Sequence, residues 1–173
     1  MTMSYQQADA IIEQHLPMFA MEEIMIDGRN TRCWKNAPPS MRALFENTLQ
    51  FGDKTYIVYE GEAMSYSEHY QQVVAVGNKL INDFGIGKGD RVAIAMRNYP
   101  EWSVAFWAAT SIGAIVVPIN AWWTPDELEY GLNDSGVKVL FADQDRFDRF
   151  NAISKPTTVC LLYTSDAADD VAS

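Results

Sequence analysis

Residues 87–143 read GKGDRVAIAMRNYPEWSVAFWAATSIGAIVVPINAWWTPDELEYGLNDSGVKVLFAD. Three short apolar runs within this stretch, at 91–97, 114–119 and 137–143, predict buried strands. The segments between them have the length and the start and stop signals of helices, and 144–153 predicts one more. Because strands that alternate with helices through short connections form parallel sheets with right-handed crossovers, we expect a doubly wound α/β fold with helices on both faces.

Capping residues place the helices of this stretch. Asn98, with Glu101 three residues later, predicts the start of a helix that is apolar on nearly all sides until Gly113. Thr124-Pro125-Asp126-Glu127 has the form of a capping box with proline at the first helical position. That second helix is expected to end at Ser135-Gly136, where glycine allows the left-handed backbone of a C-terminal cap.

Two segments precede the alternating region. Residues 1–52 are expected to form a lead-in of a polar helix, a hairpin around Asp27-Gly28 and a helix that starts at Pro39-Ser40 and ends at Gly52. The predicted apolar stripe of that last helix is Met41, Leu44, Phe45 and Leu49.

A second hairpin is expected around Glu60-Gly61, followed by a capping box from Ser65 to Glu68 that begins a helix ending near Gly85. Apolar or small residues at steps of three and four predict its buried face, made of Tyr66, Tyr70, Val73, Gly77, Leu80 and Phe84.

Composition restricts the class of protein. The 173 residues are 48% hydrophobic and 21% charged, as in ordinary globular domains, and the net charge of −10 argues against nucleic acid as a partner. The longest apolar stretches, 102–109 and 114–119, are far shorter than the ~20 residues of a transmembrane helix. The N-terminus lacks the pattern of a secretory signal, and Cys33 and Cys160 are too few for a disulfide framework. We therefore expect a cytoplasmic location.

Candidate catalytic and metal-binding motifs are few in this sequence. The glycines of Gly85–Asp90 follow a helix and precede a strand, the reverse of a phosphate-binding loop, so a helix stop and a turn are expected there. His15 and His69 have no partners at metal-ligand spacing, and a packing or surface role is favoured for His69. No G-x-S-x-G is present.

Trp122 and Trp123 follow the apolar run 114–119, at the carboxyl end of a strand where open α/β sheets bind ligands. They could wall an apolar pocket there, but core packing is the favoured interpretation. Residue patterns taken alone therefore predict a parallel α/β domain without a visible active site.

The assembled motifs resemble those of the adenylate-forming (AMP-binding) superfamily. Met64-Ser65-Tyr66-Ser67-Glu68 is similar to its first motif, and 87–143 resembles a G-D-R-V strand, an apolar helix, a G-A-x-x-V-P-x-N strand end and an E-L-x-Y-x-L-x-D-S-G helix. The surroundings of Asn120 and the segment NYPEW look closest to fatty acid–CoA ligases. His69 replaces the leucine usual in the first motif, which affects packing only.

The resemblance implies a two-step reaction with ATP, CoA and Mg²⁺. A carboxylate, here a fatty acid, would attack the α-phosphate of ATP to give acyl-adenylate and pyrophosphate, and the thiol of CoA would then displace AMP. The family's phosphate loop, magnesium-binding glutamate, ribose-binding aspartate and lid lysine lie downstream of the matched segment. No catalytic, cofactor-binding or metal residue is therefore assigned in this chain, and the fragment alone is expected to be inactive.

Residues 160–173 depart from the family pattern. From Cys160 to Asp169 the string CLLYTSDAAD resembles a translated sequencing-library adapter, the end of a transposon. We therefore expect 1–52 to be the lead-in, 53–159 a truncated AMP-binding subdomain and 160–173 a non-native tail. A sheet that stops after its third strand exposes an edge, so the fragment is expected to aggregate or stay partly molten.

Two alternatives remain open at this stage. The chain could be a stand-alone, non-catalytic α/β binding module, because a shared fold does not fix a function. It could also come from an amino-acid- or aryl-acid-activating member of the superfamily. Binding of a membrane by the tryptophan-rich helix 101–112 is disfavoured because the helix has no basic face.

Overall fold

The computed structural model describes residues 3–153 and 160–163, in two compact units, Met1–Ser40 and Met41–Ser173. In the first unit α1 (Tyr5–His15) is followed by the short 3₁₀ turn η1 (Pro17–Phe19) and by an antiparallel hairpin of β1 (Met21–Ile26) and β2 (Arg29–Trp34). Asp27 and Gly28 have φ values of 48° and 76°, as the two central residues of a tight hairpin turn require. The predicted polar helix and hairpin are confirmed.

The second unit begins with α2 (Met41–Glu46) and the 3₁₀ turn η2 (Asn47–Phe51). Of the predicted apolar stripe only Phe45 is buried, stacked between Tyr70 and Trp107 with centroid distances of 5.2 Å to each ring. The other three stripe residues are exposed, so the stripe was predicted too wide. The compact units divide after Ser40, and Phe45 belongs to the core of the second unit. The domain boundary expected after Gly52 stays a prediction.

A second hairpin, β3 (Thr55–Tyr59) and β4 (Glu62–Ser65), leads into α3 (Tyr66–Asn82). The predicted capping box is confirmed: the Glu68 amide donates to Ser65 Oγ at 3.1 Å, and the Ser65 amide donates to Glu68 Oε2 at 2.7 Å. Past the helix end, Gly85 has a φ of 61° and its amide donates to the carbonyl of Ile81. This left-handed residue reverses the chain, as predicted.

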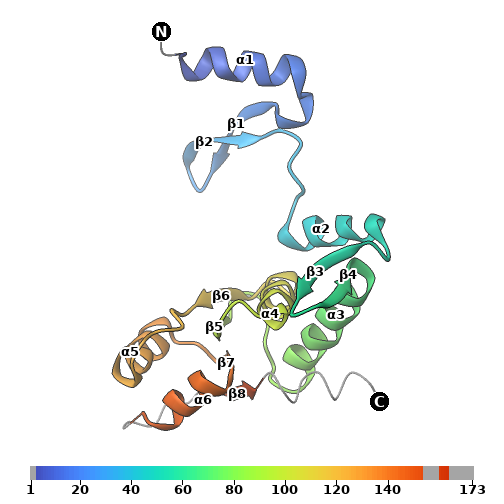
Figure 1. Ribbon diagram of the computed structural model, residues 1–173. Helices are drawn as coiled ribbons and strands as arrows, with labels where there is room; N and C mark the ends of the chain where they lie inside the picture. The colour runs from blue at the N-terminus through green and yellow to red at the C-terminus, as the bar shows by residue number, and fades with distance from the viewer. Residues whose placement is uncertain (1–2, 154–159, 164–173) are drawn as a thin grey trace. The chain divides into compact units, whose positions relative to one another are not determined.

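The centre of the second unit is a four-stranded parallel sheet in the order β6-β5-β7-β8 (Figure 1). Its strands are β5 (Arg91–Ala95), β6 (Ile115–Pro118), β7 (Val139–Ala142) and β8 (Cys160–Tyr163). The connecting helices are α4 (Pro100–Ser111), α5 (Pro125–Ser135) and α6 (Gln144–Asn151). The predicted alternation of strands and helices is confirmed.

Alternate residues of β5 and β7 face opposite layers of helices. Val92 and Ile94 share one cluster of buried apolar residues with α3 and α4, whereas Ala93 and Ala95 share the other with α5. Both faces of the sheet are therefore covered, which confirms the doubly wound class.

The start of α4 differs from the sequence prediction. Tyr99 is the N-terminal cap residue, and its side chain makes no capping hydrogen bond; Pro100 is the first helical residue. The predicted cap at Asn98 is wrong because the fixed φ of Pro100 suits the first helical position and starts the helix there.

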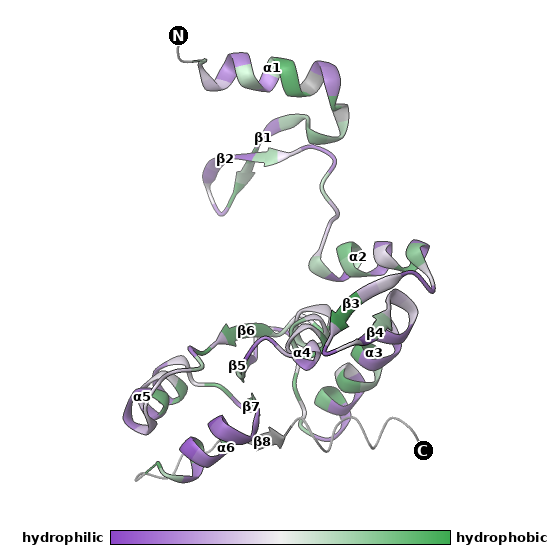
Figure 2. Ribbon diagram, viewed as in Figure 1, coloured by the Kyte–Doolittle hydropathy of each residue, from purple (hydrophilic) through white to green (hydrophobic). Residues whose placement is uncertain are grey.

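The strand β6 is apolar, as its ribbon in Figure 2 shows, but it is less buried than predicted. Ile115 is 52% exposed, whereas all four residues of β7 are buried. The difference arises because, among the strands that the structure describes, β6 lies at an edge of the sheet and pairs with β5 alone.

β8 is a fourth strand that the sequence did not predict. It pairs in parallel with β7, with Val139 opposite Cys160 and Ala142 opposite Tyr163. The expectation of a sheet that stops after its third strand is therefore wrong, because the apolar run CLLY of Cys160–Tyr163 pairs with β7 as a parallel strand. Residues 164–173 lie outside the described residues, and the adapter origin of the tail stays a prediction.

His69 is buried in the second unit, which confirms the packing role favoured for it. The residue is 2% exposed, its Nε2 and Ser103 Oγ are hydrogen-bonded at 3.1 Å, and its ring contacts Tyr56 at a centroid distance of 4.5 Å. Burial lowers the pKa of His69 to about 4. The imidazole is therefore neutral at pH 7 and packs in the core against the rings of Phe45 and Tyr56.

This burial makes a pH-dependent contribution to stability. The unfolded chain takes up a proton at His69 near pH 6.5, the ordinary value, and the folded chain only near pH 4. The contribution is complete above pH 6.5 and is lost as the pH falls toward 4, by at most about 3 kcal/mol.

We expect His69→Leu to remove this dependence of the free energy of unfolding on pH, measured by urea unfolding between pH 7 and pH 4. His15→Leu, at an exposed position, is the matched control and should retain the slope; an unchanged slope in His69→Leu would contradict the assignment.

Candidate functional site at the carboxyl edge of the sheet

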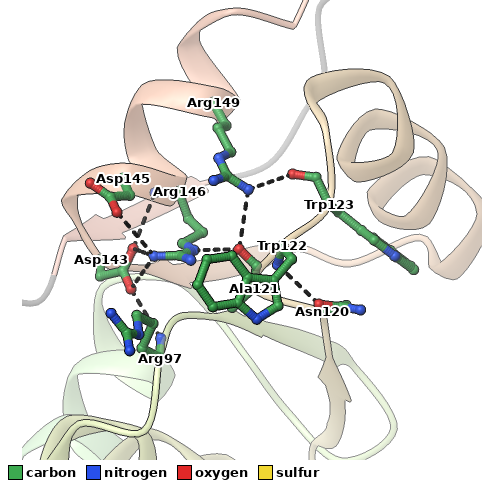
Figure 3. A network of polar contacts seen from close by, with 9 residues as sticks. All are labelled: Arg97, Asn120, Ala121, Trp122, Trp123, Asp143, Asp145, Arg146 and Arg149. Atoms are coloured by element: carbon green, nitrogen blue, oxygen red, sulfur yellow. Dashed lines mark hydrogen bonds and ion pairs between the residues drawn. The ribbon is translucent and has the colours of Figure 1, made fainter.

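The ends of three adjacent strands meet in a network of polar contacts (Figure 3). Arg97 follows β5, the loop Asn120–Trp123 follows β6, and Asp143 follows β7. Because all the strands are parallel, these segments lie at one edge of the sheet, the edge at which open α/β folds bind ligands.

Asp143 joins the end of β7 to the end of β5. Its Oδ1 accepts a hydrogen bond from the Arg146 amide at 3.1 Å, which caps the N-terminus of α6. Its Oδ2 accepts one from the Arg97 amide at 3.0 Å. One buried carboxylate therefore fixes two strand ends and the start of a helix.

Arg146 extends the network to β6. Its Nη1 lies 3.2 Å from Asp143 Oδ2, and its Nε donates to the carbonyl of Ala121 at 2.7 Å. The side chains of Arg146 and Asp143 are only 3% and 9% exposed, so the ion pair is almost entirely removed from water. A buried charge of this kind is tolerated when it is both paired and hydrogen-bonded.

Arg149, one turn further along α6, holds the same loop. Its Nη1 donates to the carbonyls of Ala121 at 3.2 Å and Trp123 at 2.8 Å. Two guanidinium groups of α6 thus satisfy backbone oxygens of the segment after β6, which aligns that segment against the helix (Figure 3).

The two tryptophans of the loop have different environments. Trp123 packs against the cluster on the α5 face, where Gly131 makes room: a Cβ at Gly131 would lie 2.5 Å from Trp123 Cζ3. The core packing favoured from the sequence is therefore confirmed for Trp123. Trp122 is 69% exposed, and its ring lies 5.6 Å from the guanidinium carbon of Arg97 and 5.5 Å from that of Arg146. These are cation–π distances.

The glycine-rich segment forms the turn expected from the sequence. The Gly87 amide donates to Asp90 Oδ2 at 3.0 Å, and Lys138 Nζ lies 2.6 Å from Asp90 Oδ1. The hydrogen bond from Lys138 is the largest cause of the lowered pKa of Asp90, and the hydrogen bond from the Gly87 amide is the next largest. The turn thus binds a carboxylate of its own chain.

Comparisons with known proteins show the family of the chain. Residues 44–172 match the family of AMP-binding enzymes. The chain belongs to the AMP-binding enzyme family. It is 36% identical over 135 residues to a long-chain-fatty-acid–CoA ligase of Salmonella typhimurium, an alignment that covers 78% of this chain and 24% of the ligase. The chain therefore spans about a quarter of the length of the curated relatives it matches.

Solved structures show the same fold. A fatty acyl CoA synthetase of Mycobacterium tuberculosis superimposes with a TM-score of 0.69 and 25% identity, over 78% of this chain and 28% of that one. An artificially fused adenylation–PCP di-domain NRPS from Klebsiella oxytoca superimposes with a TM-score of 0.65 and 22% identity, over 76% of this chain and 24% of that one.

The sequence did not predict the polar network of this AMP-binding family member. One signal for the start of α6 was visible in the sequence. Asp143 directly follows a buried run, and aspartate is a preferred N-cap residue that can accept a hydrogen bond from the amide three residues later, here that of Arg146. The contacts of Arg97, Arg146 and Arg149 join segments up to 46 residues apart, so no local pattern could indicate them.

His15 lies in the first unit and His69 in the second, and among the described residues no group of three or more His, Cys, Asp or Glu could hold a metal ion. None of the helices in 3–153 could cross a membrane.

The network predicts unequal effects for two nearby aspartates. Asp143→Ala removes the buried counter-ion of Arg146 and leaves only the contact with the exposed Asp145 among its described ion pairs, so we expect the free energy of unfolding to fall by about 3–5 kcal/mol. Asp145→Ala is the matched control, because that side chain is 74% exposed, and should cost less than about 1 kcal/mol. Chemical denaturation of both variants measures the difference, and similar losses would contradict the assigned role of Asp143.

Proposed function

We propose that the chain is the N-terminal part of a cytoplasmic, ATP-dependent acyl-CoA ligase that activates a carboxylate, in the first place a fatty acid. The observation that supports this most directly is the 36% identity to a long-chain-fatty-acid–CoA ligase. The likeness to a fatty acyl CoA synthetase structure supports the same class.

The proposed reaction has two steps. A carboxylate oxygen of the substrate bonds to the α-phosphorus of ATP, and the bond to pyrophosphate breaks, which gives acyl-adenylate. The sulfur of CoA then bonds to the acyl carbon, AMP leaves with the bonding electrons, and the thiol proton is released. When bound, Mg²⁺ would neutralise charge on the phosphates; the described residues offer no ligand cluster for it, so no step is assigned to it in this chain.

The described residues contribute scaffold rather than chemistry to this proposal. Asp143 and Arg146 fix the loop Asn120–Trp123 and the start of α6 at the carboxyl edge of the sheet. A rigid edge of this kind can support a binding site built from neighbouring segments of the complete protein. The chain by itself is accordingly expected to be inactive.

The alternative within the family is an enzyme that activates an aryl acid or amino acid. The adenylation–PCP protein shares the fold at a similar TM-score, so the fold does not distinguish the acid. A non-catalytic binding module is the alternative outside enzymology.

The test begins with the gene. Reading the source DNA across codon 159 without transposon-based library preparation gives the complete reading frame, whose product is then purified. With ATP, Mg²⁺ and CoA, we expect AMP and acyl-CoA to form only when a fatty acid is added, and pyrophosphate to be released in the same amount as AMP.

The controls separate the alternatives. Reactions without CoA test whether the acid is activated but not transferred, and benzoate and amino acids test the other acid classes. Activation of those acids and not of fatty acids would favour the aryl- or amino-acid alternative. A frame that ends with CLLYTSDAADD, or a complete protein that forms no AMP from any acid, would contradict the ligase proposal.

A further inference from the structure

The first unit has apolar side chains but no buried core. None of the side chains that the structure describes within residues 3–40 is buried. Large apolar residues of the hairpin are open to solvent, among them Ile24, Ile26 and Met25. A two-stranded hairpin is marginally stable in water, and units of about 40 residues are often stabilised by association. The apolar surface of this unit is therefore a candidate interface.

One face of the hairpin is already in contact with α1 and the turn η1. Asp9 of α1 forms an ion pair with Arg32 of β2, and the ring of Phe19 packs edge-on against Trp34 at a centroid distance of 6.0 Å. Arg32 and Trp34 are two residues apart, so they point to the same face of the hairpin. The residues between them point to the opposite face, which is directed away from α1.

This opposite face, here called the outer face, is apolar between an acidic end and a basic end. It consists of three cross-strand pairs: Glu22 with Cys33, Ile24 with Thr31, and Ile26 with Arg29. Ile24 and Ile26 are 41% and 42% exposed. The side chains of Glu22 and Arg29 are exposed and form no ion pair with the residues that the structure describes. The outer face therefore offers two isoleucines and two opposite charges to a partner.

The positions of these charges fit a second copy of the same face. When two such faces stack about a two-fold axis that runs across the strands, the second hairpin has the reverse direction. The Glu22 end of each copy then lies over the Arg29 end of the other, and Ile24 lies over Ile24 of the second copy. With the axis along the strands, Glu22 would instead meet Glu22 and Arg29 would meet Arg29, which like-charge repulsion disfavours.

We propose that the outer face of the hairpin packs against the outer face of a second copy of this chain, in an antiparallel dimer with two-fold symmetry. The contact buries the isoleucines of both copies and pairs Glu22 with Arg29 at each end. The face is about 20 Å long and two strands wide. This is smaller than a standard protein interface, so the dimer is weak and reversible. The proposal does not depend on the ligase reaction, because it concerns assembly alone.

The test is sedimentation velocity of the 173-residue chain over a series of concentrations, in which we expect a reversible equilibrium between monomer and dimer. Glu22→Arg and Arg29→Glu should each weaken the dimer by about tenfold or more, because each change places like charges together at both ends of the contact. The double variant exchanges the two charges and should dimerise as the unchanged chain does. Glu62→Arg, the same change of charge at an exposed position of β4, is the matched control and should leave the dimer unaltered.

Disulfide cross-linking tests the geometry of the dimer. In a chain with Cys33→Ser and Cys160→Ser, a mild oxidant should link Ile24→Cys into a covalent dimer, because that position lies beside the two-fold axis. Met25→Cys, on the α1 side of the hairpin, is the matched control and should link little. Circular dichroism checks that each variant is folded.

Three results would overturn the proposal. The chain could remain a monomer up to its solubility limit, which would show that the outer face does not pair with a second copy. The double variant could fail to restore the association that the single charge reversals weaken. The two introduced cysteines could cross-link equally, which would show random contact between chains and not a defined dimer.

Discussion

The buried ion pair between Asp143 and Arg146 fixes the arrangement of the carboxyl edge. A charge removed from water must be paired and hydrogen-bonded, and here the partners come from three strand ends and from the first turn of α6. Because each of these segments supplies a contact that the pair requires, none can shift independently. The loop with the two tryptophans therefore has a defined place although it has no regular secondary structure.

The two sides of the sheet differ in the residues that they bury. β5 and β7 contribute Val92, Ile94, Val139 and Phe141 to the core on the α3 and α4 side. On the α5 side they contribute Leu140 and three alanines, Ala93, Ala95 and Ala142. α6 is mostly hydrophilic along its ribbon (Figure 2). Its attachment therefore relies on polar contacts from Arg146 and Arg149 as well as on the apolar contacts of Phe150.

Local patterns were enough to predict most of the elements. The capping boxes at Ser65 and Thr124 act between residues three apart, and both form as the sequence indicates. Asn98 failed as a cap because Pro100, two residues later, imposed its own start on α4. β8 was missed because CLLY was interpreted by its resemblance to an adapter, whereas this short apolar run pairs with β7 as a parallel strand.

The candidate site could not be predicted in the same way. Asp143 and Arg146 are close in sequence, but Arg97 and Ala121 reach them only through the order of the strands, which local periodicity does not specify. Trp122 and Trp123 are adjacent and chemically identical, yet one packs in the core and the other is exposed. The difference depends on Gly131, a residue on another element that leaves space for one ring. Membership of the AMP-binding family explains the scaffold, and the chain covers about a quarter of its curated relatives.

The coupling energy between Asp143 and Arg146 tests most directly whether this ion pair fixes the carboxyl edge of the sheet. A double-mutant cycle would compare Asp143→Ala, Arg146→Met and the double variant in chemical denaturation of the 173-residue chain. We predict that the double variant loses about 2–3 kcal/mol less than the sum of the single variants, because each single change removes the buried partner of a buried charge and the double change leaves neither charge. Losses that add, with no coupling, would show that the pair does not hold the edge of the sheet together.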